Sequence, residues 1–170
     1  MQNHLTFTPA LPADLGGILL IIEEARQFMK NQHSGQWQDG TPTKETIIND
    51  IAHRQFFVAK MGEEVVGCLA LLNHEEGYDR LLTGQWVGHG SYKVIHRFAT
   101  RRDYFGQGIA GYMLKQAEHI ALSEHVKLLR VDTHQLNIPM TRLLLKHGYV
   151  MTGTTLIEKT KLRTTFEKLL

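Results

Sequence analysis

Two adjoining stretches of the chain decide the fold: Ile95-His96-Arg97-Phe98-Ala99-Thr100 and, after a polar link, Phe105-Gly106-Gln107-Gly108-Ile109-Ala110-Gly111. Residues 92–100 predict a strand, and residues 108–123 predict a helix whose apolar residues recur at steps of three and four. At the turn between them, backbone N–H groups and the positive end of the helix dipole would converge on one point. Glycines suit such a turn, because a Cβ atom would hold a phosphate away from the backbone. The stretch therefore predicts an anion-binding turn between a strand and a helix.

The same glycines allow two other interpretations. Residues 106–111 match the dinucleotide-binding pattern G-x-G-x-x-G, and Asp132 follows at the end of the next strand. In that fold the first glycine directly follows the strand, whereas residues 101–105 intervene here, so a nicotinamide-dependent oxidoreductase is a poor fit. In the plainest interpretation, Gly106, Gly108 and Gly111 only make a tight turn and let the helix pack on a sheet.

The rest of the chain shows further strand and helix patterns. Strands are predicted near residues 5–8, 56–59, 65–72, 128–133, 149–157 and 164–170, and helices near residues 13–32, 47–51 and 138–147. Residues 73–91 are polar and rich in glycine, and they predict a loop. Because no internal repeat and no linker is found, residues 1–170 are expected to form a single α/β domain.

Composition and charge exclude several classes of protein. The 170 residues are 42% hydrophobic and 21% charged, as in ordinary globular domains, and the net charge of +2 is too small to require a nucleic-acid partner. The N-terminus lacks the pattern of a signal peptide, and the longest apolar run, residues 18–22, is far shorter than the ~20 residues that a bilayer requires. Cys68 is the single cysteine, which favours a reducing compartment. We therefore expect a cytoplasmic protein that binds neither nucleic acid nor membrane.

Two motifs carry a resemblance to a known family. Residues 95–100 with 105–110 resemble the coenzyme-A-binding motif of the GNAT superfamily of N-acetyltransferases, whose pattern is Arg or Gln, two residues, Gly, one residue, and Gly or Ala. Gly108 and Ala110 match this pattern, while Phe105 stands in the place of Arg or Gln. Downstream, residues 130–137 and 143–149 resemble the second motif, a strand, an Asn and a helix that ends in Gly-aromatic. The order of elements fits along the whole chain, so the resemblance implies a GNAT-like single domain, with a mixed central β-sheet flanked by helices and with splayed parallel central strands.

The resemblance also implies acetyl-CoA as co-substrate and a primary amine of a small molecule, amino acid or peptide as acceptor, with direct transfer in a ternary complex. The residues expected to contact the coenzyme are Phe98, Ala99, Thr100, Phe105, Gly106, Gln107, Gly108, Ile109, Ala110, Gly111, Asn137 and Met140. Asn137 is also placed to cap the helix that begins at residue 138, and the two roles can coexist. Members of the family often pair, so a homodimer through the last strands is possible.

Three residues are candidates for acid–base chemistry. An amine with a pKa near 10.4 is only about one part in 10³ neutral at pH 7, so a base with a pKa near 7 helps transfer. We expect His96 to be that base, on the same strand face as Phe98. Asp132 and His134 lie two apart on the next strand and could hold a water that relays the proton. Each of the three has a structural alternative as a hydrogen-bonded side chain of the sheet.

A second position, besides Phe105, departs from the family pattern. Many members use a tyrosine in the last helix to protonate the departing thiolate, and the matching residue here is Leu144. Another group or water would then supply the proton, the coenzyme would leave as an anion, or the protein would be a weak enzyme. The rival interpretation is a catalytically weak acyl-CoA-binding sensor or interaction module.

The acceptor site is expected between the first two helices. Trp37 with Asp39 suits an ammonium group, through a cation–π contact and charge, and Trp86 could form the opposite wall. Alternatively, both tryptophans cap the hydrophobic core. None of the ten histidines pairs at helical spacing in a metal-binding motif, so no metal site is expected.

Overall fold

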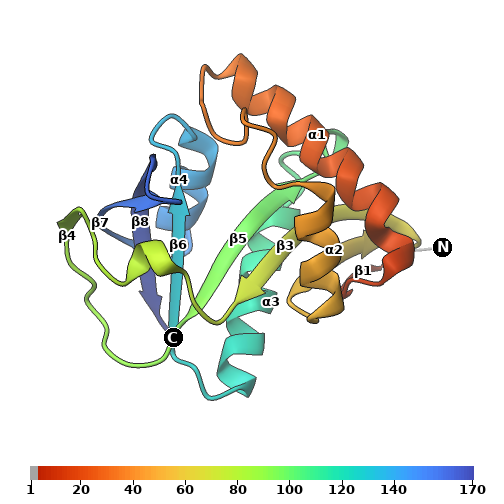
Figure 1. Cartoon of the computed structure of the whole chain (residues 1–170). Coiled ribbons are helices and arrows are strands. Elements are labelled where there is room, and N and C mark those ends of the chain that lie inside the picture. The colour runs from red at the N-terminus through yellow and green to blue at the C-terminus, as the bar shows by residue number, and fades with distance from the viewer. Residues whose placement is uncertain (1–3) are drawn as a thin grey trace.

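The computed structural model describes residues 4–170 and arranges its strands in one mixed sheet (Figure 1). The strands are β1 (Leu5–Pro9), β2 (Phe56–Met61), β3 (Glu64–Leu72), β4 (Thr83–Gly84), β5 (Lys93–Thr100), β6 (Leu128–Thr133), β7 (Val150–Ile157) and β8 (Lys161–Leu169). Their order in the sheet is β1-β2-β3-β5-β6-β8-β7-β4. Only β5 and β6 pair in parallel, whereas every other pair in this part of the chain is antiparallel. The predicted mixed α/β sheet is confirmed.

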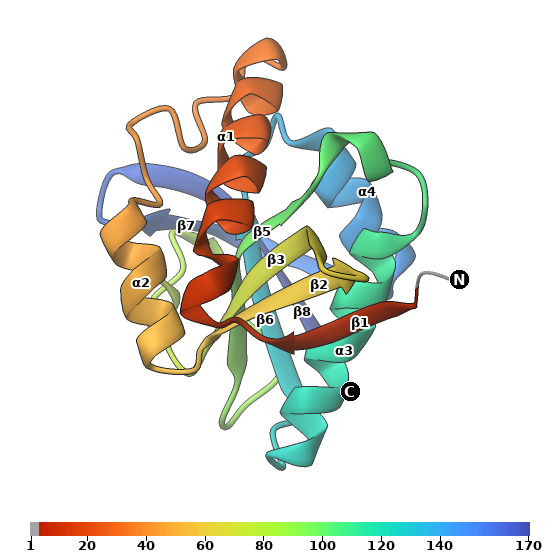
Figure 2. The same ribbon diagram turned by 90° about the vertical axis from the view of Figure 1, so that its right-hand side faces the viewer.

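Helices cover both faces of the sheet (Figure 2). They are α1 (Leu15–Asn31), α2 (Lys44–Ala52), α3 (Ile109–Ser123) and α4 (Ile138–Lys146). Isoleucines of α1 and α2 pack on one face of β2 and β3, and residues of α3 and α4 pack on the other face. Each fully buried Ile or Leu contributes roughly 1.5–3 kcal/mol relative to an exposed side chain. None of these helices combines the length and the apolar character that a membrane span needs.

Residues 73–91, predicted to be a loop, are more ordered than their composition indicates. They contain one helical turn, Glu76–Tyr78, and the short strand β4. Glu167 of β8 anchors the loop: its carboxylate accepts hydrogen bonds from the N–H groups of Val87 at 2.9 Å and Gly88 at 2.6 Å. The ordered loop brings Tyr78, which is only 1% exposed, beside the central strands.

The two parallel central strands separate partway along their length. Pairing between β5 and β6 runs from Lys93 with Leu129 to Ile95 with Val131, although β5 continues to Thr100 and β6 to Thr133. Figure 1 shows the two strands diverging above this point. The predicted splay is present, and it leaves an opening in the middle of the sheet.

A β-bulge in β5 lies at the mouth of this opening. The register against β3 changes by one residue between the pairs Ala70–His96 and Cys68–Ala99, and Arg97 has a positive φ of 52°. An extra residue in a strand interrupts the alternation of side chains. His96 therefore faces the side of α2, while Phe98 packs with the cluster on the side of α3. The expectation that His96 and Phe98 share a face is wrong, because it assumed an unbroken strand.

Candidate active site

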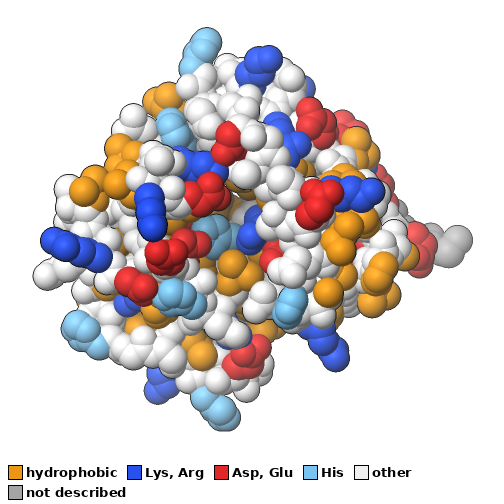
Figure 3. Space-filling view, in the orientation of Figure 1, with side chains coloured by type: hydrophobic (Ala, Val, Ile, Leu, Met, Phe, Trp, Pro, Cys, Tyr) orange, Lys and Arg blue, Asp and Glu red, His pale blue; other side chains and the backbone are white. Residues whose placement is uncertain are grey.

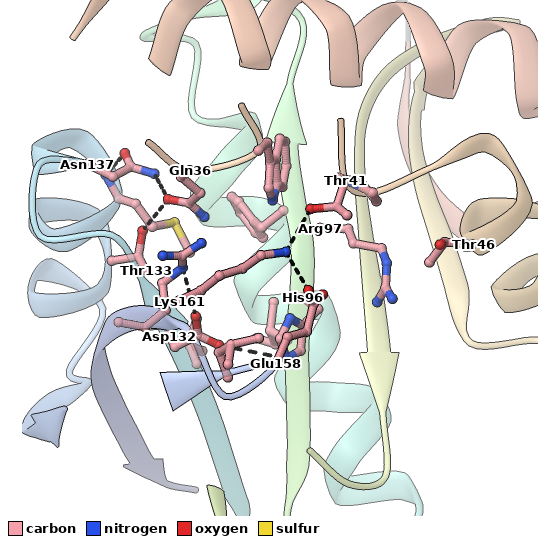
Figure 4. A pocket seen from close by; sticks show the side chains of 18 residues that line it. Gln36, Thr41, Thr46, His96, Arg97, Asp132, Thr133, Asn137, Glu158 and Lys161 are labelled. Atoms are coloured by element: carbon pink, nitrogen blue, oxygen red, sulfur yellow. Dashed lines mark hydrogen bonds and ion pairs between the residues drawn. The ribbon is translucent and has the colours of Figure 1, made fainter. Parts of the chain in front are cut away.

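Two cavities meet at the opening between β5 and β6. The coenzyme cavity, as we name it, has a volume of about 470 Å³ and lies between the start of α3, the end of α1 and α4. The acceptor cavity has a volume of about 230 Å³ and lies on the α2 side of the sheet, under the segment that joins α1 to α2 (Figure 4). Phe98, Asn137 and Met140 line both cavities. A ligand that fills one cavity can therefore reach a ligand in the other.

The turn before α3 forms an anion-binding surface in the coenzyme cavity. Gly108 caps the helix with a φ of 83°, and Gly106 has a φ of 79°. A Cβ atom at either glycine would meet no atom within 4 Å, so the space above the turn is open. Within residues 4–170, no carbonyl accepts a hydrogen bond from the N–H groups of Gly106 or of residues 108–111. Exposed N–H groups at a helix N-terminus are typical of phosphate-binding sites.

Gly111 has a different role from the other two glycines. A Cβ atom there would lie 2.8 Å from Nε2 of His147, a residue of the turn that ends α4. Glycine at this position lets α3 approach α4 closely. The two interpretations of the motif thus divide between its glycines: Gly106 and Gly108 leave a surface open for a ligand, and Gly111 permits helix packing.

The structure brings together nearly all of the residues expected to contact the coenzyme. The lining of the cavity includes Phe98, Ala99, Thr100, Phe105, Gly106, Gly108, Ile109, Ala110, Gly111, Asn137 and Met140. Gln107 does not line it, because its side-chain amide donates instead to the carbonyl of Asp103 at 3.2 Å. Asn137 also accepts a hydrogen bond from the N–H of Met140, so it caps α4 while it faces both cavities.

The acceptor cavity is strongly polar. Its charged and titratable lining residues are His96, Arg97, Asp132, Glu158, Lys161 and Arg163 (Figure 4). Figure 3 shows acidic, basic and histidine side chains gathered around a depression in the middle of this face. Such a cavity suits a small polar molecule better than an apolar one.

His96 occupies the centre of this cavity, between two carboxylates. Its Nε2 atom lies 3.3 Å from Oε2 of Glu75 and 3.7 Å from Oδ1 of Asp132. The interaction with His96 lowers the pKa of Glu75 and outweighs the effect of its burial. The ring of Tyr78 stacks on the imidazole with centroids 6.2 Å apart. His96 thus lies between two carboxylates and an aromatic ring in the acceptor cavity.

Asp132 is itself held by residues that the sequence did not indicate. The hydroxyl of Tyr78 donates to Oδ1 of Asp132 at 2.6 Å, and Nε of Arg163 lies 3.7 Å from Oδ2. Glu75 and Tyr78 belong to the stretch predicted to be an unstructured loop, and no motif marks them. The site therefore includes a set of residues, Glu75, Tyr78 and Arg163, that fixes His96 and Asp132 in place.

His134 does not join this cluster. β6 ends at Thr133, and beyond it Nδ1 of His134 accepts a hydrogen bond from the N–H of Leu136 at 3.2 Å. Burial and the nearby charge of Arg163 lower the pKa of His134. The expected water relay between Asp132 and His134 is not supported, because the chain turns before the side chains can share a face.

The three residues expected around the acceptor separate in the structure. Trp37 lines the acceptor cavity. Asp39 does not line it, because its carboxylate pairs with Lys161 at 2.6 Å and accepts from Thr41. Trp86 lines neither cavity: its indole donates to the carbonyl of Tyr78 at 2.8 Å, and its ring packs on the guanidinium of Arg130. Trp86 therefore caps a small apolar cluster, as the alternative interpretation expected.

Leu144, which departs from the pattern that the resemblance implies, is a core residue. Leu144 is fully buried in the core between α3, α4 and the sheet. In the described part of the chain, the residues that line the acceptor cavity include no tyrosine. Tyr104 lines the coenzyme cavity.

Comparison with known proteins agrees with this architecture. Over residues 22–149 the chain matches the Acetyltransferase (GNAT) family. It is 29% identical to a protein named Uncharacterized N-acetyltransferase YesJ from Bacillus subtilis (strain 168). The aligned region of 112 residues covers 65% of this chain. The match spans only 62% of the length of that relative.

Solved structures show the same fold over nearly the whole chain. A GNAT-family acetyltransferase from Streptococcus agalactiae 2603 superposes with a TM-score of 0.88 and 28% identity, covering 100% of this chain and 98% of that one. PaiA N-acetyltransferase from Thermoplasma acidophilum, solved in complex with coenzyme A, has a TM-score of 0.75 at 16% identity and covers 98% of this chain and 99% of that one. Because the family match covers most of the sequence, the chain belongs to the Acetyltransferase (GNAT) family.

Proposed function

We propose that this protein transfers an acetyl group from acetyl-CoA to a primary amine of a small molecule, amino acid or peptide, directly, while both substrates are bound. The observation that carries the proposal is the meeting of two cavities at the splayed strands, one with open backbone N–H groups and one polar with a histidine at its centre. The curated relative is named an N-acetyltransferase, and one structural relative binds coenzyme A, which supports the same activity here.

The residues of the coenzyme cavity fit acetyl-CoA. The open N–H groups of Gly106 and of residues 108–111 suit pyrophosphate oxygens, and no side chain occupies the space above Gly106 and Gly108. When bound, acetyl-CoA supplies a thioester, an activated acetyl group. Phe98, Asn137 and Met140 line the passage between the cavities and would contact the acetyl-bearing end.

His96 would take a proton from the acceptor amine. Its imidazole faces the acceptor cavity, and the carboxylates of Glu75 and Asp132 would stabilise the imidazolium that forms. Beyond Ile95, β5 has no partner on the β6 side within the described residues, so backbone N–H groups on that edge are free to polarise the acetyl carbonyl. Holding the amine and the thioester in the reactive orientation would also speed the transfer, because such alignment can lower the activation barrier by roughly 7–11 kcal/mol.

A second candidate is a catalytically weak acyl-CoA-binding module. Two departures from the pattern that the resemblance implies favour it: the buried Leu144 matches a tyrosine of that pattern, and Phe105 matches its Arg or Gln. This module would bind acetyl-CoA through the same glycines and show little turnover.

A cytoplasmic location and a homodimer through the last strands also stay predictions.

A thiol-release assay tests the proposal. Wild-type protein with acetyl-CoA and a panel of primary amines is expected to release free thiol in proportion to acetylated amine. Gly108→Val should abolish turnover, because valine is strained at a positive φ and its side chain fills the open space. Gly16→Ala is the matched control, since Gly16 lies in α1 with no atom within 4 Å of its Cβ position. Tight acetyl-CoA binding without turnover on any amine would favour the binding module instead.

A further inference from the structure

The bulge in β5 gives the acceptor cavity a second functional side chain next to His96. Consecutive residues of a regular strand point to opposite faces. Here the extra residue and the positive φ of Arg97 place both side chains on the α2 side of the sheet. Arg97 lies 3.1 Å from Asp50 of α2, while His96 faces Asp132, and both line the acceptor cavity (Figure 4). A base and a guanidinium are thus adjacent in one small cavity.

The guanidinium of Arg97 is poorly satisfied by the protein. Its side chain is only 19% exposed, yet within residues 4–170 neither Nε nor Nη1 makes a hydrogen bond. Asp50 is close, but its Oδ2 also lacks a hydrogen bond. Burial raises the pKa of Asp50, which weakens it as a counter-charge. Nε lies 3.1 Å from Asp50 without making a hydrogen bond, and Nη1 is buried with no partner among the described residues. Because buried polar groups are nearly always paired, the Nη1 donor in this polar cavity points to an acceptor group from a ligand.

The other cations of this cavity have partners. Lys161 pairs with Asp39 and with Glu158, both at 2.6 Å. Arg163 donates to the carbonyl of Leu162 at 2.9 Å and lies near Asp132. Among the described cations that line this cavity, Arg97 is the one whose buried nitrogen atoms make no hydrogen bond.

We propose that Arg97 binds the carboxylate of the acceptor, and that the acceptor is a small amino acid whose amine lies at His96. The proposal rests on the function proposed above and narrows its substrate class. A guanidinium matches a carboxylate through two parallel N–H···O bonds. His96 and Arg97 line the same small cavity, so an acceptor that carries its amine and its carboxylate close together can contact both side chains. The volume of about 230 Å³ also suits a small molecule.

The test compares amino acids with their amides. Glycine, alanine, serine and threonine should each have a kcat/KM at least about 30-fold above that of the corresponding amide, as for a buried charge pair. Amides carry the less basic amine, so a preference for the acids cannot come from a larger neutral fraction. The variant Arg97→Gln combined with Asp50→Asn removes both charges and leaves no uncompensated buried carboxylate. It should lose the preference for acids and keep the activity on amides.

Two single variants serve as controls. Asp50→Asn retains Arg97 and should keep the preference for acids. Arg142→Gln removes an exposed arginine of α4 outside both cavities and should behave as wild type.

Calorimetry separates this proposal from the proposed function. The free protein and its complex with CoA are each titrated with the acids and the amides, so the result does not require turnover. Binding of acids over amides that disappears in the double variant supports the proposal. Equal binding, or turnover with a preference for amides or polycationic amines, overturns it while the acetyltransferase assignment stands. If acetyl-CoA does not bind, the proposed function fails, and titration of the free protein still decides the role of Arg97.

Discussion

Replacing His96 by Gln tests the assignment of the base. His96 lines the acceptor cavity, is 19% exposed, and has carboxylate oxygens at 3.3 and 3.7 Å to stabilise its charged form. An alkyl amine with a pKa near 10.4 is about one part in 10³ neutral at pH 7, a deficit of roughly 4–5 kcal/mol. General base catalysis typically contributes about 10²–10⁴-fold. We expect kcat/KM of His96→Gln to fall about 10²–10³-fold at pH 7 and the loss to shrink to about 10-fold or less at pH 10, where the amine loses its proton unaided.

Thiol release measured from pH 6 to pH 10 gives the profile. His119→Gln, a change on the exposed side of α3, should leave the profile unchanged. Acetyl-CoA affinity and melting temperature, measured for both variants, show whether the fold and the coenzyme cavity are intact. If His96→Gln lowers the rate by the same factor at every pH, or does not lower it, His96 is not the base.

Three further changes test other parts of the structure. Asp39→Asn should cost about 0.2–1 kcal/mol at pH 7, because the hydrogen bond and ion pair with Lys161 hold the pKa of this half-exposed carboxyl well below its usual range. The cost should shrink progressively as the pH falls from about 4 toward that lowered pKa, and a difference in melting temperature between variant and wild type that stays constant with pH would refute it. Glu167→Ala should lower the free energy of unfolding, measured in urea, by about 3–5 kcal/mol, because it leaves the buried guanidinium of Arg130, which lies 2.8 Å from Glu167, without its ion-pair partner. A loss under about 1 kcal/mol would contradict this. Leu144→Tyr should lower the free energy of unfolding by about 1–3 kcal/mol, because the larger ring must fit into a fully buried position, and it should not raise kcat. A higher kcat would show that a tyrosine at this position reaches the thiolate.

The coenzyme cavity could be predicted from sequence because its parts are contiguous. A strand, a glycine turn and a helix N-terminus lie within residues 93–123, and local conformation alone places their N–H groups together. Phe98, Ala99 and Thr100 follow from the same stretch. The same pattern predicts a coenzyme contact for Gln107, whereas the structure shows that its side chain turns to the carbonyl of Asp103.

The acceptor cavity could be predicted only in part because its parts are distant in sequence. Tyr78 and Asp132 are 54 residues apart and meet only when residues 73–91 fold over the central strands. Composition described that segment as polar and turn-rich, which says nothing about its contacts. Trp37 was found because it is a lone aromatic in a polar segment, but the same reasoning misplaced Trp86, whose partners Tyr78 and Arg130 come from other elements.

The bulge shows why even a correctly predicted strand can mislead. Residues 92–100 form the expected strand almost to the residue. One inserted residue then moves every later side chain to the other face, because the period of a strand is two. It separates Phe98 from His96 and brings Arg97 beside it, and no property of these residue types signals the insertion.

Residues 106–111 are proposed to bind coenzyme A, and calorimetric titration with acetyl-CoA, CoA and NADH tests this binding directly. We expect saturable binding of acetyl-CoA that CoA displaces and NADH does not. Binding should weaken at least about 10-fold in Gly108→Ala, a milder change than valine, and stay unchanged in Gly16→Ala. Absence of coenzyme A binding, or binding of NADH that CoA does not displace, would refute this role and leave the glycines as a turn that serves only packing.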